Sequence, residues 1–351
     1  MSASTFLTNV LTQLTLAGQA DRGRARVLVL GSLAISALSL FWFAIGTNLL
    51  EFTAARALTG VAIGAYAPSA RAIVAASDPE HVGHHLGRLA SADLAGFIAG
   101  PMVGVIIVNV ARLKTPFWIF FGLLIVSLAA LSGQPFPAGR TDGPQRRTTS
   151  FDLLRSRRVV VAVLLAVALY LPVGVYDSLW SRYLEDRGAS VLFTGLSLSA
   201  YGIPFVLLAA LGGRLADRHG PVRTCLRALI IIVPIVSLYG HMPTPGLVIM
   251  VGFAEAIAQA VAVPSSQAAM VLACPPARIA GGQGLAGAAA QLSAGLTALV
   301  AAPVYAATGP GVLFGATSVV IGLIALAAAL VNRGLRVPVV GSPQPHSRAA
   351  G

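Results

Sequence analysis

Long apolar runs separated by short charged segments constrain this chain more than any other feature. A helix that crosses the hydrocarbon core of a bilayer needs about 20 mostly apolar residues. Runs of that kind, preceded by a shorter Thr-rich segment at 4–17, are predicted at 27–48, 49–75, 86–110, 115–133, 158–180, 191–212, 224–240, 246–272, 281–306 and 310–332. The sequence therefore predicts an all-α integral membrane protein with about eleven transmembrane helices.

The composition excludes the other broad classes. The chain is 56% hydrophobic and only 10% charged, whereas soluble proteins carry about 25% charged residues and disordered chains are poor in aliphatic residues. The net charge of +12 lies in short groups between apolar runs, which is typical of membrane proteins and not of a nucleic-acid-binding face. We expect the lipid bilayer as the environment and no nucleic-acid partner.

The basic residues also predict the orientation. If residues 18–26 face the cytoplasm, 19 of the 24 Lys and Arg residues fall on that side, in loops, in the tail or at the adjoining ends of spans, and four fall on the other. Cytoplasmic loops of membrane proteins carry such an excess. The prediction is a multi-pass protein of the cell inner (cytoplasmic) membrane.

One polar segment divides the chain. Residues 134–157 are rich in Pro, Gly and Arg and are predicted to form a cytoplasmic linker. The linker separates an N-terminal transmembrane bundle at 1–133 from a C-terminal bundle at 158–334, which a cytoplasmic tail at 335–351 follows. The linker arginines either satisfy the charge bias alone or bind anionic lipid headgroups.

An acidic-basic cluster occurs once in each half. The second copy, GRLADRHGPVR at 213–223, has glycines that permit a tight turn, an aspartate that can cap a helix N-terminus and arginines that stay in the cytoplasm. It resembles the loop signature G-x-L-A-D-R-x-G-x-x-R of the major facilitator superfamily. The residues that match are Gly213, Asp217, Arg218, Gly220 and Arg223. The resemblance implies that the aspartate pairs across the two halves and gates the cytoplasmic side.

The first copy, AGQADRGRAR at 17–26, departs from this pattern. It keeps Asp21, Arg22 and Arg26, but its glycines are out of register. A gating role for Asp21 and Arg22 is therefore expected only by analogy with the second copy.

Two further stretches resemble the proton-coupled drug exporters of the same superfamily. GRLASADLAGFIAGPMVG matches the antiporter motif G-x8-G-x3-G-P-x2-G through Gly87, Gly96, Gly100, Pro101 and Gly104. The small residues predict close helix packing, and the alternative is generic membrane packing glycine.

RALTGVAIG at 56–64 resembles the R-x-x-Q-G motif of these exporters, with Thr59 in place of Gln. The resemblance implies a place for Arg56 in a proton relay. The alternative is an arginine that extends outward to the membrane interface.

Ionisable and amide groups inside predicted spans are candidate proton-coupling or cavity residues, because such groups are costly in lipid. They are Arg56, Asp93, Glu255 and Gln259. Glu255 is predicted near the midplane with Gln259 one turn away, and its alternative role is that of a neutral, hydrogen-bonded residue within the bundle. No catalytic constellation, metal-ligand spacing or ATP-binding loop stands out, so we expect no enzyme, no metal and no cofactor, with a proton gradient as energy source.

The resemblance covers most of the chain and implies the major facilitator fold of two pseudo-symmetric bundles. The family has twelve helices, and this sequence starts in the equivalent of the second. We expect a monomeric secondary transporter that exports small amphipathic or cationic molecules, such as drugs, by proton antiport through alternating access. The alternatives are a sugar or metabolite exporter of the same superfamily and a non-transporting remnant or membrane scaffold.

Overall fold

The computed structural model describes residues 2–112, 114–134 and 150–334, and these residues form helices joined by short turns. The elements are α1 (Ser2–Gln19), η1 (Ala20–Arg24), α2 (Ala25–Ile45), α3 (Leu49–Ser77), α4 (Val82–Val110), α5 (Thr115–Ser132), η2 (Phe151–Arg155), α6 (Arg157–Glu185), α7 (Val191–His219), α8 (Pro221–Tyr239), α9 (Pro245–Ala273), η3 (Pro276–Arg278) and α10 (Ile279–Arg333). The predicted all-α class is confirmed. Most of the predicted linker and the tail at 335–351 lie outside the described residues.

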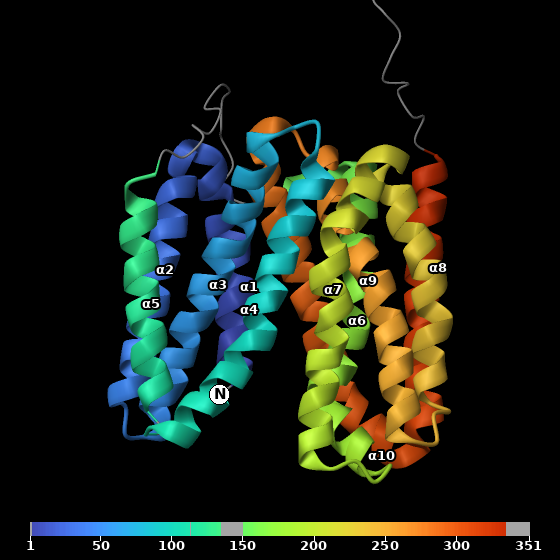
Figure 1. The fold of residues 1–351 in the computed structure, drawn as a ribbon. Helices are drawn as coiled ribbons and strands as arrows, with labels where there is room; N and C mark the ends of the chain where they lie inside the picture. Colours follow the sequence, from blue (N-terminus) through green and yellow to red (C-terminus); the bar gives the residue numbers. More distant parts are fainter. Residues whose placement is uncertain (1, 113, 135–149, 335–351) are drawn as a thin grey trace, which may run out of the picture.

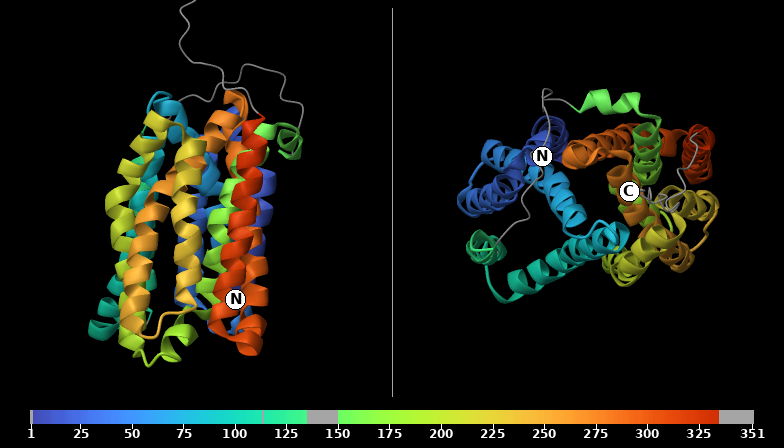
Figure 2. Two further views of the ribbon diagram at one scale, coloured as in Figure 1. Left: turned by 90° about the vertical axis from the view of Figure 1, so that its right-hand side faces the viewer. Right: turned by 90° about the horizontal axis from the view of Figure 1, so that it is seen from above.

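The helices form two groups that stand side by side, α1–α5 and α6–α10 (Figure 1). The main contacts between the groups join α4 to α7 and α1 to α10, with further contacts from α4 to α9 and α3 to α10. Figure 2 shows the same two groups from the side and from above. This arrangement places the turns α1–α2, α3–α4, α7–α8 and α9–α10 together at one end, which we call the basic end.

Helix α10 is too long to be a single straight crossing. Its 55 residues would measure about 80 Å as one rod, but Gly309 has a non-helical backbone with φ 79° and ψ 177°. Glycine adopts a positive φ without a steric penalty, and Pro310 follows Gly309. The chain therefore reverses direction there, and α10 consists of two helical segments. Eight described segments are long and apolar enough to cross a membrane, and Ser4–Ile45 and Pro276–Arg333 each contain such a break. The count of about eleven crossings stays a prediction.

The largest hydrophobic core lies within the second group of helices. It joins α6, α8, α9 and α10 and includes the large buried side chains Tyr183, Tyr239 and Phe314. Two smaller clusters connect the groups near the basic end: Leu86 of α4 packs with Val271 of α9, and Ala90 of α4 packs with Phe205 of α7. The structure therefore holds the two groups in contact through apolar packing at this end.

Candidate functional site

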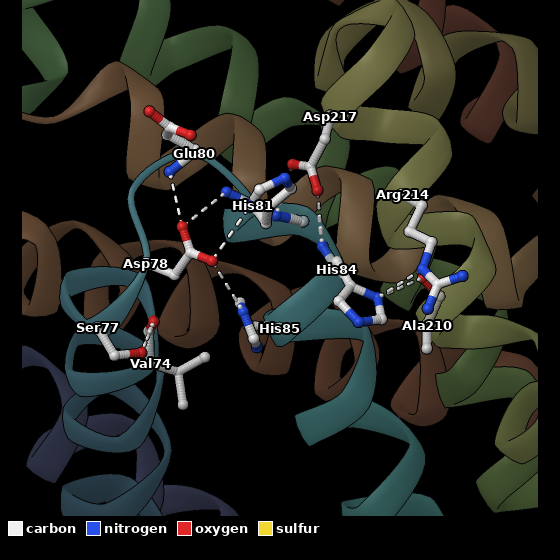
Figure 3. A network of polar contacts seen from close by, with 11 residues as sticks. Val74, Ser77, Asp78, Glu80, His81, His84, His85, Ala210, Arg214 and Asp217 are labelled. Carbon is white, nitrogen blue, oxygen red and sulfur yellow. Dashed lines mark hydrogen bonds and ion pairs between the residues drawn. The ribbon is translucent and has the colours of Figure 1, made fainter.

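The second acidic-basic cluster lies at the C-terminal end of α7 and contacts the other group of helices. Gly220 has a φ of 86° and makes the turn into α8. The carboxylate of Asp217 accepts hydrogen bonds from the backbone N–H groups of Gly83, at 2.7 Å, and His84, at 2.9 Å (Figure 3). Both donors are in the first turn of α4, where helical N–H groups have no partner within the helix. Asp217 thus caps a helix that belongs to the other half of the chain.

Histidines surround this cap. The Arg214 Nε atom donates to His84 Nδ1 at 3.2 Å, while Asp78 lies within 3.2 Å of ring nitrogens of His81 and His85 (Figure 3). Burial would raise the pKa of Asp78, but these imidazole contacts and two backbone N–H groups outweigh it and hold the pKa below its ordinary value. Among the described residues no group of three His, Cys, Asp or Glu side chains is arranged to hold a metal ion.

The first cluster makes an equivalent contact despite its irregular glycine spacing. Asp21 accepts hydrogen bonds from the backbone N–H groups of Ala280 and Gly281, both at 2.7 Å, in the first turn of α10. Gly23 has a φ of 79° inside the η1 turn, so it supplies the left-handed residue that Gly220 supplies in the other copy. The η1 turn accommodates the different glycine spacing of the first cluster. Each cluster therefore caps a helix of the opposite half: Asp21 caps α10, and Asp217 caps α4.

Burial shifts the titration of Asp21, which lies in the η1 turn between the apolar helices α1 and α2. Removal of its carboxylate from water raises the pKa of Asp21 to about 6. The N–H groups of Gly281 and Ala280 and the charge of Arg278 oppose this rise. Because burial causes the rise, the pKa of Asp21 should return toward its ordinary value when separation of the halves exposes the carboxylate to water.

The arginines of the two clusters lie at the same end of the structure as these caps. Arg22 is half-buried, whereas Arg218 and Arg223 are exposed. Gly213 is buried where α7 crosses α4, and a Cβ added to it would overlap the backbone of Gly83. The predicted gating residues are thus assembled at the basic end, with only the aspartates making the helix caps.

The antiporter-motif helix is α4, and its glycines differ in surroundings. A Cβ added to Gly87 would overlap the backbone of Ala209 and Ala210 in α7. At Gly96 and Gly100 an added Cβ would meet no described atom within 4 Å. The close approach predicted for this motif therefore occurs at Gly87. Pro101 and Gly104 lie in the same helix, Val82–Val110.

A cavity of about 570 Å³ lies between the two groups of helices. Its wall combines apolar residues with amides and tyrosines, and it carries one acidic and one basic side chain, Asp93 of α4 and Arg71 of α3. The polar wall residues are Asn9, Gln13, Tyr66, Arg71, Asp93, Tyr170, Ser266, Gln267, Gln283 and Gln291. A mixed lining of this kind can hold a molecule that has both an apolar surface and hydrogen-bonding groups.

Glu255 and Gln259 are not on this wall. Glu255 is fully buried within the second group of helices, where Oε2 accepts hydrogen bonds from the hydroxyls of Tyr176 and Tyr239, each at 2.8 Å. Gln259 Nε2 lies 3.4 Å from the other carboxylate oxygen. These contacts correspond to the structural alternative for Glu255, a hydrogen-bonded residue within the bundle.

Arg56 is also remote from the cavity wall. Its guanidinium is exposed and lies 5.4 Å from the centre of the Phe43 ring. Ser39 and Thr59, the residue in the position of the motif's Gln, share a hydrogen bond of 2.7 Å. The structure brings Arg56 together with an aromatic face, and not with Asp93.

The sequence reasoning did not identify the amides of α1. Asn9 and Gln13 are buried, Gln13 Nε2 donates to Asn9 Oδ1 at 2.7 Å, and no described residue donates to Gln13 Oε1. The signal available in the sequence was their spacing of four residues, which places both on one helix face. Arg71 of α3 also lies on the cavity wall, a position that the charge bias of the sequence does not indicate.

A cavity between two helical groups, with reciprocal caps closing one end, defines a multi-pass membrane transporter of two related halves. The family model of the Major Facilitator Superfamily matches the chain twice, over residues 1–181 and 162–350. The chain belongs to this superfamily, and it is therefore a transporter-family protein and not an enzyme.

Curated relatives include multidrug resistance proteins named MdtG. The protein from Enterobacter lignolyticus is 24% identical over 276 residues, which cover 76% of this chain and 66% of the relative. The protein from Serratia proteamaculans is 25% identical over 281 residues, covering 77% and 68%. The chain thus spans about two thirds of the length of these relatives.

Solved structures show the same fold. The crystal structure of the human organic anion transporter MFSD10 (TETRAN) is 22% identical, with a TM-score of 0.76, and the match covers 93% of this chain and 82% of that one. The Escherichia coli fucose:proton symporter FucP is 15% identical with a TM-score of 0.72, covering 94% and 89%. At these identities the likeness concerns the fold alone.

Proposed function

We propose that this protein exports small amphipathic molecules, cationic ones included, by proton antiport across the cytoplasmic (inner) membrane. The relatives named multidrug resistance protein support drug-like substrates. The cavity is the observation that carries the proposal. It lies between the halves and is lined by apolar and hydrogen-bonding groups, and Asp93 is the one carboxylate among the described residues of its wall.

The two aspartate caps support an alternating-access cycle. Both lie at the basic end, which the charge bias predicts to be cytoplasmic, and both join one half to the other. The structure therefore represents the form closed on this side. Breaking the caps would let the halves rock apart and expose the cavity to the cytoplasm, as in transporters built from two repeats.

Asp93 is the group that we propose for proton coupling. It faces the cavity near Arg71 and Tyr66, close enough for electrostatic interaction with both. A carboxylate in a cavity can hold either a proton or a cationic group of the substrate, and such competition exchanges one for the other. Glu255 lies off the wall, and Tyr176 and Tyr239 already occupy one of its oxygens.

The test measures ethidium uptake into inverted membrane vesicles that carry an imposed proton gradient. Wild type should accumulate the dye when the gradient is present. Asp93→Asn should lower the gradient-driven rate at least about tenfold while leaving dye binding within about threefold. Glu255→Gln, which keeps the hydrogen-bonding shape at a buried site, is the matched control and should retain at least about half of the wild-type rate.

Other outcomes would redirect the proposal. Loss of coupling in Glu255→Gln with normal transport in Asp93→Asn would exchange the two roles. Absence of gradient-driven transport in wild type would contradict proton antiport and favour the remnant or scaffold alternative.

The sugar or metabolite alternative is supported by the amides on the cavity wall, because carboxamides hydrogen-bond hydroxyl groups well. Competition separates the two classes. Excess neutral sugar should leave ethidium transport unchanged if the substrates are amphipathic, and should inhibit it if the cavity is built for hydroxyl-rich molecules.

A further inference from the structure

Three parts of the chain meet at the first turn of α10. From the first half, the Asp21 carboxylate accepts the Ala280 and Gly281 N–H groups. From the segment that precedes α6, Ser150 Oγ reaches the same spot: a Cβ added to Gly281 would lie 2.5 Å from it and 3.1 Å from Asp21 Oδ2. A glycine is thus needed for the three segments to converge.

The segment before α6 is fixed to the turn before α10 by an ion pair. Arg278 donates to Asp152 through both terminal nitrogens, Nη1 to Oδ2 at 2.5 Å and Nη2 to Oδ1 at 2.9 Å. A bidentate ion pair of this kind holds both side chains in one orientation. The pair is largely shielded, with side-chain exposures of 27% and 20%, so it should contribute more than an ordinary surface pair.

Neighbouring residues anchor this segment to the second half. Leu153 is buried in the large hydrophobic core of that half, and Ser150 is buried against α10. Asp152 therefore sits on a fixed support. Through Arg278 it holds η3, the three-residue turn whose last residue is Arg278 and which leads directly into α10.

The guanidinium of Arg278 also acts on the cap itself. Its charge interacts with Asp21 as well as with Asp152, so one cation lies between a carboxylate of the first half and a carboxylate of the segment before α6. Without Asp152, the arginine could turn toward Asp21 and compete with the helix N–H groups for its oxygens. The ion pair keeps Arg278 in place and leaves the Asp21 oxygens directed at α10.

We propose that Asp152 and Arg278 are positioning residues for closure of the basic end: their ion pair holds the N-terminus of α10 where Asp21 caps it. The end of the segment that joins the two halves is thereby part of the closing device, and not only a tether. This inference rests on the alternating-access part of the proposed function and is independent of substrate and coupling ion.

The experiment measures exposure of the cavity to the basic end. A cysteine replaces Gln291 on the cavity wall, in a background where the buried Cys225 and Cys274 are changed to alanine. Inverted vesicles are treated with a membrane-impermeant maleimide, and the labelling rate reports how often this end opens. Asp152→Asn, which keeps the side-chain size, should raise the rate at least about fivefold.

Two comparisons make the test specific. Asp152→Glu, which keeps a carboxylate for Arg278, should label at a rate within about twofold of wild type. Glu80→Ala removes an exposed carboxylate from the same end and should leave the rate unchanged. Thermal unfolding of each variant, followed in detergent, shows whether an increased rate reflects opening or general loss of structure.

A labelling rate in Asp152→Asn equal to that of wild type would overturn the proposal. So would an increase in labelling that the unfolding temperature explains fully, or equal effects from Asp152→Asn and Glu80→Ala. Because labelling needs no transport, these results stay distinct from a failure of the efflux assay, which would contradict proton antiport but not the positioning role.

Discussion

Single residues at the basic end differ in how far the sequence could predict them. Asp217 is predictable, because the loop signature and the helix-capping preference of aspartate point to the same role, and the structure places it at the first turn of α4. Asp21 could be matched only by analogy, since its glycines are out of register. Gln13 offered only its spacing of four residues from Asn9, with which it shares a hydrogen bond. Asp152 gave no signal, because its partner Arg278 is distant in sequence and only tertiary packing brings the two together.

Closure at the basic end should depend on pH through Asp21. Burial raises the pKa of Asp21 to about 6, although the N–H groups of α10 lower it; if opening returns this carboxylate to water, closing takes up a proton at pH values between the ordinary pKa and about 6. The stabilisation from protonation is complete at low pH and is lost as the pH rises through about 6. We expect the closed-to-open ratio to be about tenfold higher at pH 5 than at pH 7.5.

Distance distributions from double electron–electron resonance can measure this ratio. Spin labels at Arg24 and Leu272, both exposed, report the separation of the two halves in lipid nanodiscs. Asp21→Asn supplies the comparison. A pH response as large in Asp21→Asn as in wild type would exclude Asp21 as its source.

The apolar runs predicted which segments are helical, but several helices extend beyond those runs. The run at 86–110 corresponds to α4, which begins at Val82, and the run at 158–180 corresponds to α6, which continues to Glu185. Helical hydrogen bonding continues beyond the apolar layer, where hydropathy no longer indicates it. The motif on α4 predicted close packing, but the particular glycine at the contact depends on where α7 crosses.

Matched substitutions on α4 test this crossing. Gly87→Ala adds one methyl group that would overlap the backbone of Ala209 and Ala210, so α4 and α7 must separate near the basic end. We expect cavity labelling from this side to rise at least about tenfold. Gly100→Ala adds the same group where no described atom lies within 4 Å, and it should label as wild type does. Equal labelling of the two variants would show that the α4–α7 contact does not control closure.

At the scale of the whole molecule, the repeat in the sequence predicted two related halves, and the family model matches the chain over two overlapping ranges, 1–181 and 162–350. The resemblance implied a contact of Asp217 across the halves, but the sequence did not predict which helix each aspartate caps, because that contact depends on how the halves dock. The docking also determines which polar residues surround the cavity. For that reason Asp93 faces it, whereas Glu255, placed near the midplane by helix rise alone, does not.

The central claim is that the two aspartate caps close the basic end over the cavity, and labelling of Gln291→Cys from inverted vesicles tests it most directly. Asparagine at position 21 or 217 keeps one acceptor oxygen but sets an NH₂ group against the second backbone N–H. A buried N–H group left without an acceptor costs about 1–3 kcal/mol. The account predicts slow labelling in wild type and at least about tenfold faster labelling when Asp21→Asn and Asp217→Asn are combined. Equal, slow labelling in both proteins would contradict it.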